Sequence, residues 1–235
     1  MSTAVDLLAS LFALASEEKA AVYRRFFRTG PGQYGEGDRF LGVTVPQVRA
    51  VEKLFRRELT LADVQDLLAH EVHEARQCAL IHLVARYGRA DAAGREAIFA
   101  LYLANTARIN NWDLVDVSAP GIVGAHLHGR DPGRLFELAA SPLLWDRRIA
   151  IIATQFFIRK GHLDTTFALC ERLLGDGQDL IHKACGWMLR EAGQKDENRL
   201  RAFLDAHAAS MPRVELRYAL EKLPPEVRAH YLALR

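Results

Sequence analysis

The stretch Glu74-Ala75-Arg76-Gln77-Cys78-Ala79 decides the fold, because similar stretches return further along the chain. Each copy places a basic residue near an expected helix start and follows it with small and apolar residues. The basic residues of successive copies are 72, 35 and 34 positions apart. The repeat unit is therefore roughly 35 residues long, and the first interval spans two units, with the skipped unit near Trp112. Those basic residues are Arg76, Arg148, Lys183 and Arg217. The later copies are Asp146-Arg147-Arg148-Ile149-Ala150, His182-Lys183-Ala184 and Leu216-Arg217-Tyr218-Ala219.

Helical periodicity fills the rest of the chain, and signals for strands are nearly absent. Val5, Leu8 and Leu11 recur at helical spacing, and the abundant Ala, Leu, Arg and Glu favour helix. Breakers such as Gly30-Pro31-Gly32 and Pro224-Pro225 divide the chain into helices of ordinary length. We therefore predict an all-α fold, a right-handed α-solenoid of HEAT-like helix pairs with a concave face, in a single domain over residues 1–235.

The composition is that of a soluble globular protein. The chain has 235 residues, of which 50% are hydrophobic and 26% are charged, so it can bury a core. No apolar run is long enough to cross a membrane, and residues 1–6 lack the basic start of a signal peptide. Cys78, Cys170 and Cys185 are scattered, which favours small core residues in a reducing compartment. We expect a cytoplasmic protein.

The charge balance leaves a nucleic-acid function open. A net charge of +2 neither indicates nor excludes a basic binding face, because acidic residues elsewhere can balance one. In a solenoid the inner helices line a concave surface, where Arg76, Arg148, Lys183 and Arg217 would form a positive track. The alternative is that they are ordinary solvated side chains, and the repeat pattern alone does not distinguish the two.

Motifs for familiar cofactors and metals are missing. The chain has no P-loop, no dinucleotide-binding fingerprint, no His-Glu-x-x-His and no Gly-x-Ser-x-Gly. His70 and His73 lack a convincing third ligand. We interpret them, like His126 and His128, as surface histidines, and we expect neither a metal nor a cofactor.

The segment Asn110-Asn111-Trp112-Asp113-Leu114-Val115-Asp116 is the strongest candidate for chemistry. Asn110 can cap a helix, and Asp113, three residues on, can complete a weak capping box. Trp112 and Asp116 are four residues apart, about 40° around a helix, so they can present an indole and a carboxylate to one spot. The alternative is a core tryptophan beside a solvated or ion-paired aspartate.

Two later segments combine tryptophan with arginine. Leu144-Trp145-Asp146-Arg147-Arg148 opens an apolar helix with two arginines, a position suited to phosphate or carboxylate contact. The segment Gly186-Trp187-Met188-Leu189-Arg190-Glu191 places its tryptophan three residues before its arginine, on neighbouring helix faces. For both segments the alternative is core packing beside a surface charge.

Three of these segments, together with the stretch Phe40-Leu41-Gly42-Val43 and Pro46, resemble the AlkD family of DNA alkylation repair enzymes. They follow the family's order and span nearly the whole chain. The resemblance implies a HEAT-like solenoid whose concave face holds duplex DNA. It also implies excision of purines alkylated at N3 or N7, such as 3-methyladenine and 7-methylguanine, without a cofactor. The four segments are Phe40-Leu41-Gly42-Val43 with Pro46, Asn111-Trp112-Asp113-Leu114-Val115-Asp116, Trp145-Asp146-Arg147-Arg148, and Lys183-Ala184-Cys185-Gly186-Trp187-Met188-Leu189-Arg190-Glu191.

The resemblance assigns catalytic roles to four residues. Asp116, the second aspartate of its motif, matches the catalytic carboxylate. Trp112 and Trp187 match aromatic walls against the sugar and backbone of the lesion nucleotide. Arg148 matches a residue that holds the DNA backbone beside the lesion.

The resemblance also suggests contacts to DNA outside the lesion. In the family, the helix after the Phe40-Leu41-Gly42-Val43 stretch meets a backbone phosphate, which makes Thr44 and Arg49 candidate contacts. Tyr34 is the candidate for a tyrosine that the family places near the DNA. The remaining candidates are the basic residues of the repeat and of the two tryptophan segments, namely Arg76, Arg147, Lys183, Arg190 and Arg217.

The implied chemistry fits these residue types. An N3- or N7-alkylated purine is already cationic and leaves readily, so catalysis mainly needs to stabilise the oxocarbenium-like sugar. A carboxylate can do this electrostatically and orient the attacking water, and tryptophan faces favour a cationic sugar. Most glycosylases extrude the base into a pocket, whereas the resemblance implies action without base flipping. We expect a monomeric, monofunctional alkylpurine DNA glycosylase that acts on duplex DNA in the cytoplasm, at the nucleoid.

Two other classes of function stay open. A DNA-binding relative without catalysis would bind abasic DNA but release no base, and the joint presence of Trp112, Asp116, Arg148 and Trp187 argues against it. A HEAT-type protein-interaction scaffold would bind DNA no better than background and with little effect of salt.

Overall fold

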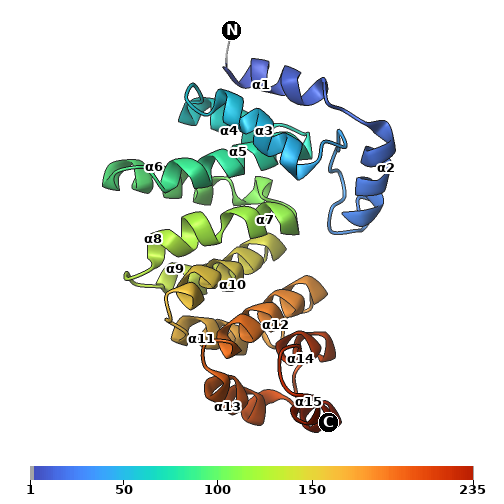
Figure 1. The fold of residues 1–235 in the computed structure, drawn as a ribbon, viewed down its shortest axis with the longest axis vertical. Coiled ribbons are helices and arrows are strands. Elements are labelled where there is room, and N and C mark those ends of the chain that lie inside the picture. Colours follow the sequence, from blue (N-terminus) through green and yellow to red (C-terminus); the bar gives the residue numbers. More distant parts are fainter. Residues whose placement is uncertain (1–2, 235) are drawn as a thin grey trace. The chain divides into compact units, whose positions relative to one another are not determined.

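The regular elements of the protein are helices throughout residues 3–234, the part described by a computed structural model. Extended pairing within these residues is limited to one isolated bridge between Arg39 and Val72. The chain divides into two compact units, Met1–Ser118 and Ala119–Arg235 (Figure 1). The predicted all-α fold is therefore confirmed. The right-handed solenoid and the single HEAT-like domain stay predictions.

The first unit is built from short helices joined by turns. Several helix starts carry the expected sequence signal, because Ser16, Thr60 and Asp91 each cap the following helix through a side-chain oxygen. In chain order the elements are α1 (Thr3–Phe12), α2 (Glu17–Phe26), α3 (Val45–Phe55), α4 (Leu61–Ala69), α5 (His73–Tyr87), α6 (Ala92–Ala104), the 3₁₀ turn η1 (Thr106–Arg108) and α7 (Trp112–Ser118).

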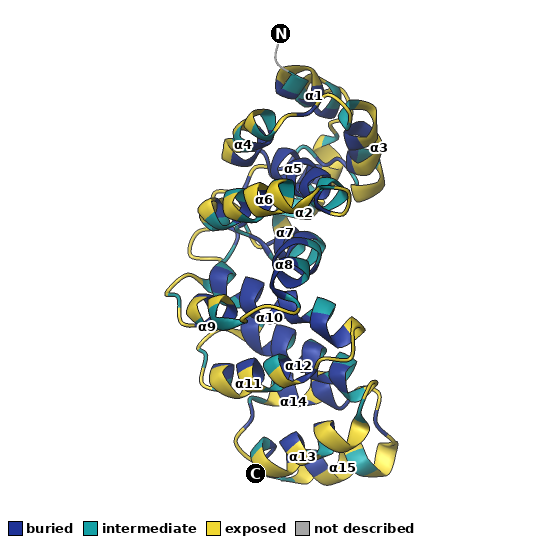
Figure 2. Cartoon of the chain, turned by 90° about the vertical axis from the view of Figure 1, so that its left-hand side faces the viewer, coloured by how far each residue is buried: buried dark blue, intermediate teal, exposed yellow. Residues whose placement is uncertain are grey.

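Helix α5 is the core of the first unit. It packs against α3, α4 and α7, and 12 of its 15 residues are buried, so it is almost entirely dark blue in Figure 2. A helix buried on every side also buries polar side chains, here including His73, Arg76 and His82. These groups need partners, because a buried polar group left unpaired costs about 1–3 kcal/mol. The partners of α5 therefore fix how its neighbours are placed.

The second unit is organised around three helices. Helix α12 (Asp179–Gly193) packs against both α10 (Leu144–Arg159) and α14 (Arg213–Ala219). A buried contact of 3.1 Å between His182 Nδ1 and Glu215 Oε2 joins α12 to α14. The other elements are the π-helical turn η2 (Pro120–Gly124), α8 (Ala125–Leu127), α9 (Gly133–Ala139), α11 (Asp164–Leu173), α13 (Glu197–His207) and α15 (Pro225–Ala233).

The basic residues of the sequence repeat fall at equivalent places in their helices. Arg148, Lys183 and Arg217 are the fifth residues of α10, α12 and α14, and Arg76 is the fourth residue of α5. The skipped unit near Trp112 corresponds to α7, whose fifth residue is Asp116. The position that carries a cation in the other helices thus carries a carboxylate in α7.

Two expectations from composition concern the whole chain. The three cysteines are buried and free, as predicted for small core residues. Among residues 3–234, no helix is both long enough and apolar enough to cross a membrane.

Gly186 lets α12 and α14 approach closely. A Cβ atom at this position would lie 2.5 Å from the carbonyl oxygen of Glu215 and 2.6 Å from Cβ of Tyr218. Both distances are far inside van der Waals contact, and one of the two opposing atoms belongs to the backbone. Any larger side chain at residue 186 must therefore push the two helices apart.

We predict that Gly186→Ala destabilises the protein by about 1–3 kcal/mol, because overpacking outweighs the gain of roughly 1 kcal/mol in helix propensity. The measurement is chemical unfolding followed by circular dichroism. Gly175→Ala is the matched control, since a Cβ there meets nothing within 4 Å and the stability should stay within about 0.5 kcal/mol of wild type. Equal stability of the two variants would contradict the close packing of α12 on α14.

Candidate functional site

Helix α7 carries the segment that the sequence singled out. It starts at Trp112 and ends at Ser118, so Trp112 and Asp116 lie one turn apart on the same face, as predicted. Both side chains are half-buried, whereas Leu114 and Val115 on the other side of the helix are fully buried. The helix thus buries one face in the unit and keeps its indole and carboxylate partly accessible.

Asp113 does not cap α7, which corrects the expectation from sequence. Its Oδ2 accepts hydrogen bonds of 2.8 Å from both His73 Nε2 and Gln77 Nε2 on α5. Its Oδ1 is buried and has no hydrogen-bond partner among the described residues. The backbone N–H of Trp112 donates instead to Oδ1 of Asn111 at 2.9 Å. The capping box fails because two donors on α5 hold the Asp113 carboxylate, and this contact ties α7 to α5.

His73 continues the network on its other side. Its Nδ1 lies 3.0 Å from Oδ2 of Asp38, which also accepts a hydrogen bond of 3.2 Å from Nδ2 of Asn111. The Asp38 carboxylate is also paired with the guanidinium of Arg76. The His73 and Asp38 side chains are each 2% exposed. Asp38, His73 and Asp113 therefore form a buried line in which one imidazole bridges two carboxylates.

The electrostatics of this line favour a charged imidazole. Burial by itself lowers the pKa of His73, but the carboxylates of Asp113 and Asp38 outweigh burial and raise that pKa to about 9. Burial pushes the pKa of Asp38 upwards, yet the hydrogen bond from His73 and the charge of Arg76 leave the pKa below its usual value. At neutral pH the line is an ion triplet, with His73 positive between two negative aspartates.

Arg76 and His73 were both placed wrongly by the sequence. The Arg76 side chain is 2% exposed and donates from Nη1 to the carbonyl oxygens of His70 (3.0 Å) and Glu71 (2.9 Å), besides pairing with Asp38. Its amino groups are therefore already paired within the unit, and we interpret Arg76 as a structural residue. His73 was interpreted as a surface histidine but is buried, and His126 is buried too. These side chains can be buried because each has hydrogen-bond partners within its unit.

The loop before α3 is held by one carboxylate. The backbone N–H groups of Leu41, Gly42 and Val43 all donate to the side chain of Glu74, at 2.8–3.2 Å. Gly42 adopts φ +79°, and a Cβ there would lie 2.2 Å from the carbonyl oxygen of Ser16, so only glycine fits. This loop positions Phe40.

The candidate phosphate contacts follow that loop. Thr44 precedes α3 and donates from both its backbone N–H (2.9 Å) and its hydroxyl (2.7 Å) to Oε1 of Gln47. Arg49 is exposed on α3, while Thr44 is half-buried. Tyr34 is half-buried in the loop between α2 and α3, and its hydroxyl donates to the carbonyl oxygen of Phe26 at 3.4 Å.

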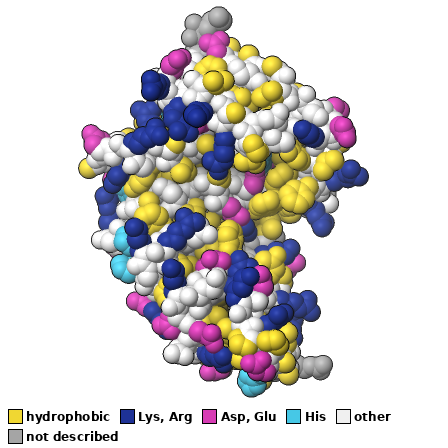
Figure 3. Space-filling view, viewed as in Figure 1, with side chains coloured by type: hydrophobic (Ala, Val, Ile, Leu, Met, Phe, Trp, Pro, Cys, Tyr) yellow, Lys and Arg dark blue, Asp and Glu magenta, His cyan; other side chains and the backbone are white. Residues whose placement is uncertain are grey.

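An aromatic cavity of about 300 Å³ opens beside α7. The Phe27 ring stacks on Phe40 (ring centroids 5.0 Å apart) and on Trp112 (5.1 Å), and Phe26 meets Trp112 edge-on at 5.6 Å. Exposed apolar side chains, Phe26 and Val45, lie at the cavity, and Figure 3 shows hydrophobic side chains gathered on this side of the unit below α2. Trp112 thus lines a cavity rather than the centre of the core. The other lining residues are Tyr23, Val43, His73, Glu74, Gln77 and Asp113.

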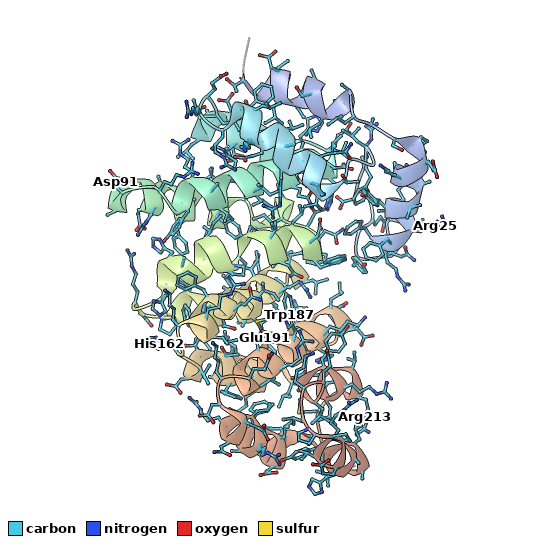
Figure 4. All side chains as sticks on the ribbon, viewed as in Figure 1. Arg25, Asp91, His162, Trp187, Glu191 and Arg213 are labelled. Atoms are coloured by element: carbon cyan, nitrogen blue, oxygen red, sulfur yellow. The ribbon has the colours of Figure 1, made fainter. Side chains whose placement is uncertain are left out.

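The second unit carries the remaining catalytic candidates on neighbouring helices. Arg148 on α10 is buried, and its Nη1 donates to the carbonyl oxygen of Leu180, in the first turn of α12, at 2.7 Å. Trp187 lies in the third turn of α12 and is half-buried; Figure 4 shows it with Glu191, one turn further along the same helix. The packing of α10 against α12 therefore brings the arginine and tryptophan elements of the sequence into one part of this unit.

The other basic candidates of the second unit differ in how far their donors are already used. Arg147 pairs with Asp176 at 2.6 Å and donates to the carbonyl oxygens of Ser141 and Pro142. Arg190 is paired with Glu191 and Glu221. Lys183 is half-buried, and Arg217 is exposed. The donors of Arg147 and Arg190 are thus already used within the protein, whereas Lys183 and Arg217 have no ion pair among the described residues.

The residues that the sequence missed are Asp38, His73 and Gln77. Nothing in their spacing links Asp38 to α5, because α3 and α4 lie between them in the sequence. The four-residue spacing of His73 and Gln77 was the one available signal, since it places both side chains on one face of α5. Among residues 3–234, no group of three or more His, Cys, Asp or Glu side chains is arranged to hold a metal ion.

The comparisons with known proteins agree on one family. The family model described as "DNA alkylation repair enzyme" matches residues 7–223. A solved structure described as a predicted DNA alkylation repair enzyme from Enterococcus faecalis has 17% sequence identity and a TM-score of 0.68, with 90% of this chain and 97% of that chain covered. That structure supports the fold alone at this level of identity. No curated protein matches the chain.

We predict that the buried ion triplet makes the first unit less stable as pH rises. The pKa of His73 is about 9 in the folded protein and about 6.5 when unfolded. Its stabilisation is therefore complete below pH 6.5 and is lost as pH rises through 9, by on the order of 3 kcal/mol. Urea unfolding between pH 6 and pH 9.5 measures this loss.

The variant His73→Gln should be less stable than wild type at pH 6 and should lose the part of the pH dependence that His73 contributes, while the part from buried Glu215, whose pKa burial raises to about 8, stays. His230→Gln is the control, because His230 is exposed, and it should keep the wild-type profile. Wild-type stability that is flat from pH 6 to pH 9.5, or a His73→Gln profile as steep as wild type, would show that His73 is not the charged centre of the line.

Proposed function

The chain belongs to the family of DNA alkylation repair enzymes, so its role lies in the repair of alkylated DNA, and we propose that it is a glycosylase that hydrolyses the N-glycosidic bond of cationic alkylpurines. The proposed substrates are 3-methyladenine and 7-methylguanine in duplex DNA. The sequence resemblance that predicted this family is confirmed by the match over residues 7–223.

The proposal rests on the different environments of the two aspartates on α7. Of the two aspartates in the segment, Asp113 is committed to His73 and Gln77. Asp116 shares the accessible face of α7 with Trp112. We therefore assign the catalytic carboxylate to Asp116 and treat Asp113 as a positioning residue, which fixes the helix that presents Asp116.

The proposed chemistry needs only what these side chains supply. As the glycosidic bond lengthens, the sugar develops positive charge and the neutral base departs. The Asp116 carboxylate stabilises that charge and orients a water molecule that adds to C1′, while the proton of the water passes to the carboxylate or to solvent. The indole face of Trp112 favours the cationic sugar through its quadrupole. No general acid for the leaving group is required, because the alkylated base already carries the positive charge.

For Arg148 and Trp187 in the second unit we propose the roles that the sequence resemblance gives them. Arg148 is held by its bond to Leu180, which orients its guanidinium for the phosphate beside the lesion. Trp187 supplies the second aromatic wall. Phosphates further along the DNA are assigned to Thr44, Arg49, Lys183 and Arg217, since Arg76, Arg147 and Arg190 are ion-paired within the protein. The protein acts as a monomer at the nucleoid in this proposal.

We predict that Asp116→Asn lowers the rate of base release about 100- to 1,000-fold, because the amide removes a charge aimed at the transition state. Asp66→Asn is the matched control, since Asp66 is exposed on α4, and its rate should equal that of wild type. The measurement is chromatographic detection of free 7-methylguanine and 3-methyladenine released from methylated duplex DNA.

Two outcomes of this assay would overturn the assignment. Well-folded wild-type protein that binds abasic DNA but releases neither base would be a non-catalytic relative. Release that is equally fast in wild type and Asp116→Asn would move the catalytic carboxylate to another residue.

We also predict that duplex DNA binding weakens linearly in a plot of log K against log salt, with a slope of about −0.9 per phosphate contacted. Arg49→Gln and Lys183→Gln should each reduce the magnitude of that slope by about 1. Lys160→Gln, at the opposite end of α10 from Arg148, is exposed and should keep the wild-type slope. Fluorescence anisotropy with an unmodified duplex measures all four proteins; binding insensitive to salt would favour a protein-interaction scaffold instead.

A further inference from the structure

A second cavity lies at the far end of α5, away from the candidate site. It has a volume of about 550 Å³ and is lined by residues from the end of α3, the following turn, the last part of α5 and the start of α6. Gln77 and His73 are near the first turn of α5 and Arg86 is in its last turn. At 1.5 Å per residue, the 13 positions from His73 to Arg86 correspond to about 20 Å. The cavity is therefore separate from the aromatic cavity beside α7.

Four arginines converge on this cavity, which we call the arginine cavity: Arg56, Arg57, Arg86 and Arg89. Arg57 and Arg89 are exposed, and neither side chain is ion-paired with another described residue. Arg86 uses Nη1 for a bond of 3.0 Å to the carbonyl oxygen of Leu59, which orients the rest of its guanidinium. Figure 3 shows Lys and Arg side chains gathered on this side of the unit, over the end of α3 and beside α6.

The carboxylates at the cavity are fewer than its arginines, and two of the three accept hydrogen bonds from other groups of the unit. Glu52 is fully buried beneath the cavity. Its two carboxylate oxygens accept hydrogen bonds of 2.9 and 3.0 Å from Nε of Arg56, and its Oε1 lies 3.1 Å from Nδ1 of His82. Asp91 caps α6 by accepting from the backbone N–H of Gly94 at 2.8 Å. The cavity has four guanidinium groups and three carboxylates, those of Glu52, Glu58 and Asp91, so its net charge is +1. Glu52 and Asp91 thus have internal partners, Glu58 is exposed, and two arginines stay available.

A buried histidine in the wall is the second, independent sign of a ligand. The His82 side chain is 2% exposed and lines the cavity. Its Nδ1 faces Glu52, and its Nε2 is buried with no hydrogen-bond partner among residues 3–234. A buried polar atom without a partner costs about 1–3 kcal/mol, so a group that pairs with Nε2 removes a standing penalty. An acidic hydroxyl or an anion that shares a proton with the imidazole would do so.

We propose that the arginine cavity binds a phosphate monoester group. Planar guanidinium groups pair with phosphate oxygens two at a time. A phosphate monoester carries about −1.5 to −2 charges at pH 7, opposite in sign to the cavity's charge of +1. Its remaining P–OH proton can be shared with Nε2 of His82. The volume of about 550 Å³ lies in the range of small-molecule sites, so the phosphate enters with the group that carries it.

The proposal does not rest on the glycosylase assignment. The arginine cavity shares no lining residue with the aromatic cavity, and neither Arg57 nor Arg89 has a role at the lesion. Loss of phosphate binding and loss of base release are therefore separable by experiment.

Isothermal titration calorimetry on the full chain at physiological ionic strength tests the proposal. The titrants are inorganic phosphate, a nucleoside monophosphate and the same nucleoside without phosphate. We expect one phosphate or nucleotide bound per chain and no binding of the bare nucleoside. The double variant Arg57→Gln, Arg89→Gln should weaken binding at least about tenfold, while base release stays at the wild-type rate. Both arginines are exposed, so the variant should fold.

The matched control removes the same charge elsewhere. Arg25→Gln, Arg228→Gln replaces two exposed arginines outside the cavity, and Figure 4 shows Arg25 on the opposite edge of the unit from Asp91 of the cavity wall. This variant should bind phosphate as wild type does. The proposal is overturned if wild type shows no saturable binding of any phosphate titrant. It is equally overturned if both double variants lose affinity to the same extent, because binding would then follow overall charge.

A further arm identifies the source of the phosphate. Duplexes that differ only in a 5′-phosphate or a 5′-hydroxyl end are compared for binding to wild type and to the Arg57, Arg89 double variant. A preference for the phosphorylated end that the double variant loses identifies the terminal phosphate of a broken strand as the ligand. Equal binding of the two duplexes, together with nucleotide binding in the calorimeter, identifies a free phosphorylated metabolite.

Discussion

The rest of the first unit depends on the buried line from Asp38 through His73 to Asp113. Each member comes from a different segment, namely the loop before α3, the first turn of α5 and the first turn of α7. A positive imidazole between two carboxylates is stable in a buried place only if all three stay together, because each charge would be costly alone. The line therefore fixes where α7 begins, and with it where Trp112 and Asp116 are presented. The candidate site therefore depends on this electrostatic requirement as well as on the burial of Leu114 and Val115.

Much of this organisation could be predicted from the sequence, and the failures have one physical cause. The helices, the equivalent positions of Arg148, Lys183 and Arg217, and the shared face of Trp112 and Asp116 all follow from local periodicity. Asp113 and Arg76 were misplaced because their partners, His73 and Asp38, are distant in sequence. Rules based on local sequence predicted that Asp113 caps a helix and that Arg76 lies on the surface. Long-range hydrogen bonds decided both, and a single sequence carries no signal for pairs 36 to 40 residues apart.

Helix α5 links two sites of opposite character. Its first turns supply His73 and Gln77 to an acidic, aromatic environment that suits a developing positive charge. Its last turns supply His82 and Arg86 to a basic cavity that suits a phosphate monoester. In both places a buried histidine stands against a carboxylate, Asp113 in one and Glu52 in the other. The difference is which groups face the cavity, since aromatic rings face the first and guanidinium groups the second.

The central claim is that this member of the DNA alkylation repair family breaks the glycosidic bond itself. The most direct measurement is a single-turnover time course with excess wild-type protein and a duplex that contains one 7-methylguanine. We predict that free 7-methylguanine and abasic duplex appear together in equal amounts, with no strand cleavage. A duplex that stays intact while fully bound by the protein would contradict it.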